Sequence, residues 1–190
     1  MSDAHAGRSA GILAALFAVS VWAAWIPGTR LGVVTKLSAW DVSALRFGVA
    51  GLVLLPVLAR RWREVPWRRA GPLAALVAGA GVPYLMAFGS GLTIANSGQG
   101  AVLGPGANSA LVALFAFALL AERPSRVRAL GLAITLVGVA LVILHDLALG
   151  AVRLGGFALI LFASSLWATY TVASRLLHLE PVLNAAVVCV

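Results

Sequence analysis

The chain has 190 residues, of which 62% are apolar and only 11% are charged. A soluble domain carries about 25% charged residues, so a soluble fold of this length could not cover so much apolar surface. The formal net charge of +8 could point to nucleic acid, but the basic residues stand in short clusters between apolar stretches. The single cysteine excludes a disulfide framework within the chain. These features indicate an all-α polytopic membrane protein.

Six apolar stretches are long enough to form helices that cross a bilayer, whose core takes about 20 helical residues. The expected spans are residues 10–29, 42–58, 71–93, 98–121, 127–144 and 154–174, and a seventh stretch, 181–190, is too short to cross. Residues 1–9 form a tail before the first span, and residues 145–153 form a loop before the sixth. The longest uncharged stretch, Ala70 to Ala121, holds two spans joined by a polar turn at 93–100.

The distribution of Lys and Arg among the loops predicts the orientation. One side of the membrane receives Arg8, the five arginines of 60–69, Arg123, Arg126, Arg128 and Arg175, and the other side receives Arg30, Lys36 and Arg153. Because positively charged loops stay in the cytoplasm, we expect a cytoplasmic N-terminus in the cell inner (plasma) membrane. The 145–153 loop and the 93–100 turn then lie on the outer side.

The sixth span restarts the sequence pattern of the first. Gly11 to Trp22 reads GILAALFAVSVW, Gly156 to Trp167 reads GFALILFASSLW, and the ungapped match extends to Arg30 and Arg175. Chance explains part of a match between two apolar helices, whereas the aligned tryptophans and arginines favour a repeat. Since five spans form one unit, the second copy would be inverted in the membrane. We therefore expect a first repeat over 10–144 and the start of an inverted second repeat over 154–190.

Polar residues inside the apolar spans mark a candidate substrate site. Arg46 is the only charge that lies within a predicted span and not at its edge, and it could attract an anion or bond to carbonyls of a neighbouring helix. Asn108 could hydrogen-bond a ligand or join helices. Trp22 could stack on a ligand or fill space between helices, and Pro105 leaves one backbone carbonyl without its helical donor.

The ordered set of motifs resembles the EamA family of the drug/metabolite transporter superfamily. The resemblance rests on Trp22-Ala23, Pro27, Arg30, Asp41, Arg46-Phe47, Pro105, Glu122-Arg123, Gly131, Gly138-Val139, Gly155-Gly156, Leu166-Trp167-Ala168 and Tyr170. It implies a ten-helix fold of two inverted five-helix repeats around a central cavity. Since this chain ends within the seventh helix of that plan, we expect a C-terminally truncated member.

The resemblance also implies a function. It predicts a secondary transporter of small organic metabolites, amino-acid-like or drug-like, that works by alternating access and favours export over import. A truncated, non-transporting membrane scaffold or subunit stays open as an alternative, and an integral membrane enzyme is a more distant one. We expect no catalytic residue, cofactor or metal. The expected partners are the lipid bilayer and a small-molecule solute, not nucleic acid, and self-association is left open.

Overall fold

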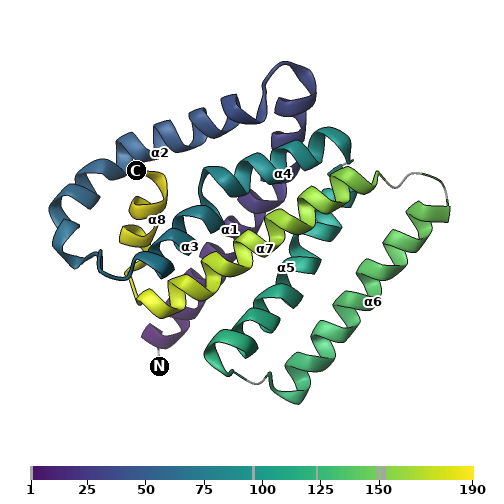
Figure 1. The fold of residues 1–190 in the computed structure, drawn as a ribbon. Coiled ribbons are helices and arrows are strands. Elements are labelled where there is room, and N and C mark those ends of the chain that lie inside the picture. The colour runs from purple at the N-terminus through teal and green to yellow at the C-terminus, as the bar shows by residue number, and fades with distance from the viewer. Residues whose placement is uncertain (1, 96, 123, 149, 151–152) are drawn as a thin grey trace.

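The computed structural model describes residues 2–190 apart from 96, 123, 149, 151 and 152. The described chain is helical (Figure 1), with α1 Ser2–Thr35, α2 Ala39–Arg61, the 3-10 helix η1 Trp62–Glu64, α3 Ala70–Ala80, α4 Val82–Ile94, α5 Ser97–Leu120, α6 Arg126–Ala148, α7 Leu154–Leu177 and α8 Pro181–Cys189. The described residues hold six candidate membrane spans, Gly11–Thr35, Ala39–Glu64, Ala70–Ile94, Gly98–Leu120, Arg126–Ala148 and Leu154–Leu177. The prediction of an all-α polytopic membrane protein is confirmed.

The third span is interrupted, although the sequence predicted one continuous helix over 71–93. Helices α3 and α4 meet at Gly81, whose backbone is extended (φ −88°, ψ −152°). A glycine favours such a break because it loses more conformational freedom than any other residue on entering a helix. Pro83 lies in the first turn of α4, where its missing N–H costs no helical hydrogen bond. The span therefore crosses as two short helices.

Several predicted boundaries also change. The first helix is much longer than 10–29, and α6 continues to Ala148, into the predicted loop 145–153. Helix α2 begins at Ala39, not at 42, because Ser38 and Asp41 form a reciprocal capping box. In that box Asp41 N donates to Ser38 Oγ over 3.2 Å, and Ser38 N donates to Asp41 Oδ2 over 2.7 Å. The turn predicted over 93–100 is shorter, since α5 is already helical from Ser97; residue 96 lies outside the described residues.

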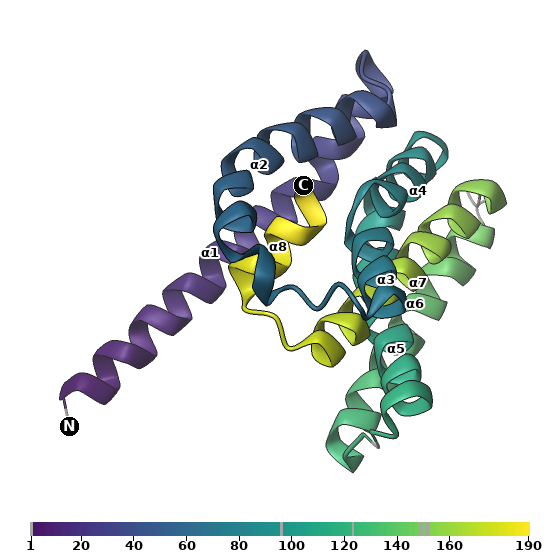
Figure 2. The same cartoon turned by 60° about the vertical axis from the view of Figure 1, so that its left-hand side comes forward.

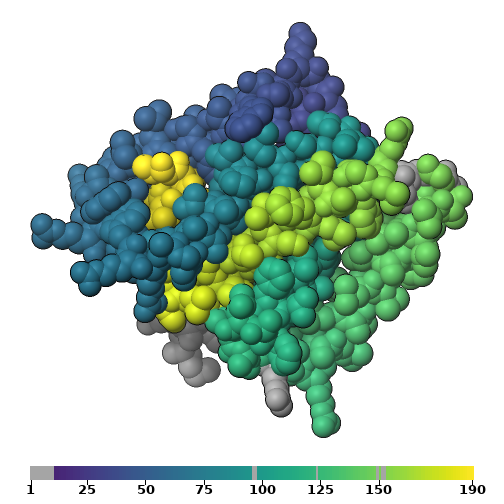
Figure 3. Space-filling model, viewed as in Figure 1, coloured from purple at the N-terminus to yellow at the C-terminus, as the bar shows by residue number. Residues whose placement is uncertain are grey.

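Helix α7 lies at the centre of the packing, in contact with α3, α4 and α5 (Figure 3). It runs antiparallel to α1, as the ribbon in Figure 1 shows. Its crossings depend on glycine: a Cβ on Gly91 would lie 2.9 Å from Ile160 Cγ1, and a Cβ on Gly156 would lie 3.0 Å from Gly91 O. The absence of side chains here lets the backbones of α4 and α7 approach closely.

Helices α1 and α6 lie at the periphery. Residues 11–24 of α1 are all exposed, and the first half of this helix projects away from the others in Figure 2. Helix α6 packs on α5 and contributes no residue to the buried core. Since the exposed residues of these two helices are largely apolar, we interpret their outer faces as lipid-facing surface.

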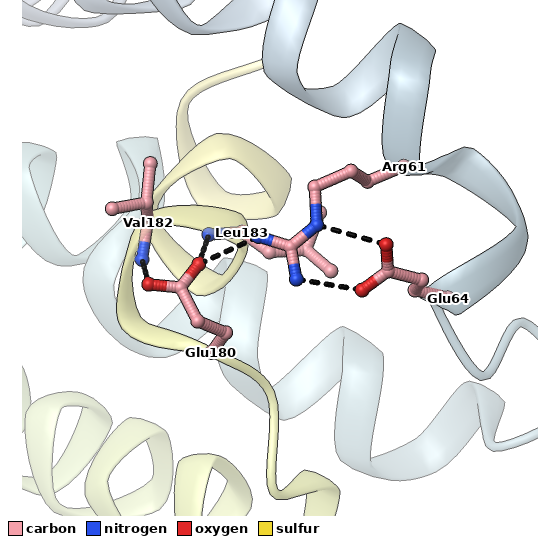
Figure 4. A network of polar contacts seen from close by, with 5 residues as sticks. All are labelled: Arg61, Glu64, Glu180, Val182 and Leu183. Carbon is pink, nitrogen blue, oxygen red and sulfur yellow. Dashed lines mark hydrogen bonds and ion pairs between the residues drawn. The ribbon is translucent and has the colours of Figure 1, made fainter.

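A polar network ties the start of α8 to the end of α2 (Figure 4). Arg61 forms ion pairs of 2.6 Å with Glu64 and 2.8 Å with Glu180. The Glu180 carboxylate also accepts from the backbone N–H groups of Val182 (3.2 Å) and Leu183 (3.3 Å), and so caps α8. Helix α8 is thereby held against α2, in whose first half Arg46 lies.

Candidate functional site

A cavity of about 340 Å³ lies between α1, α2, α4, α5 and α7. This volume falls within the range of roughly 300–1,000 Å³ that small-molecule sites occupy. All four residues singled out from the sequence line it, namely Trp22, Arg46, Pro105 and Asn108. The structure therefore brings together residues from α1, α2 and α5 that the sequence could nominate only one by one.

Arg46 lies deeper in its helix than the sequence indicated. Because α2 begins at Ala39, Arg46 is about two turns from the helix start, not one. Its guanidinium carbon lies 4.4 Å from the centre of the Trp25 ring and 5.5 Å from the centre of the Phe47 ring. No carboxylate among the described residues pairs with it. Stacking covers a face of the planar guanidinium and leaves its N–H edge available to a ligand.

Aromatic rings form much of the remaining wall. Trp22 and Trp167 meet edge to face with their centres 5.6 Å apart, and Trp167 lies 5.0 Å from Tyr84. Tyr84 in turn stacks on Phe88, at 5.7 Å. Trp22 and Trp167 are equivalent positions in the predicted repeat, so the two copies of the motif meet at this wall. Trp22 thus both packs on another ring and faces the cavity.

Helix α5 supplies the polar part of the wall. Asn108 Oδ1 is buried and has no hydrogen-bond partner within the described part of the chain. Ser164 also lines the cavity, but its hydroxyl already donates to Ile160 O over 2.9 Å. Pro105 stands inside α5 and cannot donate a backbone hydrogen bond, so its ring interrupts the helical ladder beside Asn108. Asn108 Oδ1 is therefore a buried acceptor without a partner in the described chain, whereas the Ser164 oxygen can still accept a hydrogen bond.

Sequence reasoning missed Trp25, Tyr84, Phe88, Ser164 and Trp167 as cavity residues. The repeat alignment gave one usable signal, since it paired Trp167 with the nominated Trp22. For Tyr84 and Phe88 the sequence offered no such signal, because aromatic residues in an apolar span are equally typical of a packed core.

Two other motif residues serve the scaffold outside the cavity. Arg30 donates through Nη1 to Leu92 O over 2.5 Å, which joins α1 to the end of α4. Glu122 pairs with Arg175 over 2.7 Å, although Arg126 lies closer to it in the chain. Arg123 lies outside the described residues. The observed pair links the residues following α5 to the end of α7.

The sequence profile of the EamA-like transporter family matches residues 9–144. The chain belongs to the EamA-like transporter family. A search of curated proteins and a search of solved structures returned no match. The EamA-like match covers four of the six candidate membrane spans found in the described residues, most of a fifth, and all cavity residues except Ser164 and Trp167. Membership and the spans together assign the chain to multi-pass membrane transporters of small solutes.

The cavity of this EamA-like chain combines one cation and several rigid rings with the hydroxyl groups of Tyr84 and Ser164. Arg46 is the charged group among the described lining residues, and Asn108 Oδ1 is the buried acceptor without a partner. Such a site can neutralise an anionic group at one point, cover an apolar body and accept one hydrogen bond. It holds no set of side chains that would suit nucleophilic or metal-assisted chemistry among the described residues.

Proposed function

We propose that this EamA-like protein binds a small organic solute with an anionic end and a modest apolar body, and moves it across the inner membrane by alternating access. The guanidinium of Arg46, which lines the cavity and has no carboxylate partner among the described residues, carries the proposal. Amino-acid-like and drug-like metabolites fit this description. The resemblance to the EamA family favours outward movement, and the cluster of arginines at 60–69 favours a cytoplasmic N-terminus.

The energetics of Arg46 support an anionic ligand. Placing a cation at the centre of a span costs at least about 2.5–3.5 kcal/mol, and Arg46, about two turns from the start of α2, bears part of such a cost. A cation–π contact such as the one with Trp25 contributes about 0.5–2 kcal/mol toward offsetting it. A bidentate carboxylate would supply both the missing charge and two hydrogen bonds.

The arrangement of α1 and α7 supports alternating access. These helices begin the two copies of the predicted repeat and run antiparallel (Figure 1). The aligned side chains Trp22 and Trp167 contact each other edge to face. Transporters built from inverted repeats place their substrate sites at the repeat interface, near the midplane of the bilayer. A cavity bounded by both tryptophans agrees with that plan.

Substitution of Arg46 tests the proposal in proteoliposomes, with uptake of a radiolabelled small carboxylate as the measurement. Arg46→Lys keeps the charge but loses the planar fork, so we expect reduced uptake; Arg46→Gln should reduce it further. Both variants should reach the membrane in wild-type amounts. Arg60→Gln, an exposed arginine at the end of α2, is the matched control and should keep wild-type uptake.

Each outcome of this experiment has a defined meaning. Full uptake by Arg46→Gln would overturn the proposal. Loss of folding in both Arg46 variants would assign Arg46 a structural role instead. Carboxylate binding by the wild type without uptake would favour the alternative of a non-transporting subunit over a transporter.

A further inference from the structure

We infer that the solute bound at this site is a planar aromatic monocarboxylate. The inference rests on the proposed function, since it names the class of anion that the Arg46 cavity selects. Its basis is the juxtaposition of one cation with a continuous wall of aromatic rings on α1, α4 and α7. An aliphatic acid needs only apolar cover, whereas this wall offers flat, rigid surfaces.

The rings that form the wall hold one another in place. Trp167 contacts Trp22 at 5.6 Å, Tyr84 at 5.0 Å and Tyr170 at 5.2 Å between ring centres. Tyr84 and Phe88 lie nearly parallel, with an interplanar angle of 14°. Because each ring is fixed by its neighbours, the cavity cannot readily reshape around a bulky, puckered body. A planar ring gains offset or edge-to-face contacts with such a wall, beyond the burial of its area.

The charge of the cavity limits the ligand to one carboxylate. Among the described residues that line the cavity, only Arg46 is charged, and the Trp25 ring covers part of the face of its guanidinium. A second carboxylate on the ligand would enter an apolar wall without a counter-charge, and burying an unpaired charge is strongly unfavourable. The site should therefore reject dicarboxylates that share the same ring.

Four probes of similar size test the inference on the purified, full 190-residue chain by isothermal titration calorimetry. Benzoate should bind about 2- to 10-fold more tightly than cyclohexanecarboxylate, the factor expected for one aromatic contact. Benzamide, which lacks the charge, and terephthalate, which adds a second one, should each bind at least 10-fold more weakly than benzoate.

The variant Trp167→Leu should bring the affinities of benzoate and cyclohexanecarboxylate together. Trp67→Leu is the matched control, because Trp67 packs on Trp62 outside the cavity, and it should keep the wild-type preference. Trp22→Leu provides a second test in case Trp167→Leu does not fold, since Trp22 is 46% exposed and its replacement disturbs less packing.

The outcomes separate this inference from the function on which it rests. Equal binding of benzoate and cyclohexanecarboxylate by the wild type would overturn the aromatic preference and leave the anion site intact. Binding of benzamide as tight as that of benzoate would overturn the role of Arg46 and with it the proposed function. An unchanged benzoate preference in the folded tryptophan variants would overturn the assignment of these rings.

Discussion

The substitution Gly79→Ala tests the crossing of α3 and α7 that positions the cavity wall. A Cβ at residue 79 would lie 2.6 Å from Tyr170 Cβ and 2.7 Å from Tyr170 N, and it would also meet Leu166 O. Carbon atoms not bonded to each other normally stay about 3.5–4.0 Å apart. Because two of these three atoms belong to the backbone of α7, the contact can be relieved only if the helices separate.

The size of the effect follows from two opposing terms. Overpacking of a close contact costs typically about 1–3 kcal/mol, and a backbone clash belongs at the upper end of that range. The better helix propensity of alanine stabilises the folded chain by at most about 1 kcal/mol. We therefore expect a net destabilisation of about 2 kcal/mol. For a chain of 150–250 residues this lowers the Tm by roughly 4–8 °C.

Thermal unfolding in detergent, followed by circular dichroism, measures this effect. Gly138→Ala is the matched control: Gly138 lies within α6, and a Cβ there has no atom within 4 Å. It should leave the Tm unchanged or raise it, since only the propensity term acts. A Tm of Gly79→Ala equal to that of the wild type would refute the close crossing. Trp167 lies between Leu166 and Tyr170 on α7, so a shift of these residues would move this cavity ring. Gly79→Ala should therefore also weaken benzoate binding.

The other predictions concern topology, pH and the positioning of the cation. In a cysteine-free background, Thr93→Cys should react with an impermeant maleimide from outside intact cells and Ser125→Cys should not; equal labelling would contradict the predicted orientation. Hydrogen bonds from the backbone N–H groups of α8 lower the pKa of Glu180 below its usual value, and the N–H of Val182 has the largest effect. The stabilisation from Glu180 should therefore be present above its usual pKa and be lost as the pH falls through the lowered value. Glu180→Gln should show no such loss of Tm, and the same dependence of Tm on pH in this variant and the wild type would contradict the prediction. Trp25→Leu removes the ring that holds the cavity guanidinium in place and should weaken benzoate binding, with Trp25→Phe intermediate; unchanged affinity in Trp25→Leu would exclude that positioning role.

The sequence-based predictions that the structure confirms depend on local composition. Partitioning into a bilayer depends on the apolarity of some 20 consecutive residues, so the six spans could be located without knowing how they pack. The same reasoning explains the cavity residues that polarity revealed: Arg46 and Asn108 are costly in lipid, so they indicate a protein-lined interior wherever the helices lie.

Tertiary structure decided the features that depend on helix rotation and helix approach. Tyr84 and Phe88 are ordinary apolar residues in sequence, and they line a cavity only because α4 turns them toward α7. Glu122 pairs with Arg175 because the ends of α5 and α7 meet, although closer arginines in the chain were available. Sequence determined which segments enter the membrane and which residues cannot face lipid, because those properties are local. The packing of α7 against α3, α4 and α5 determined what surrounds Arg46, because contacts between distant segments exist only once the helices are assembled.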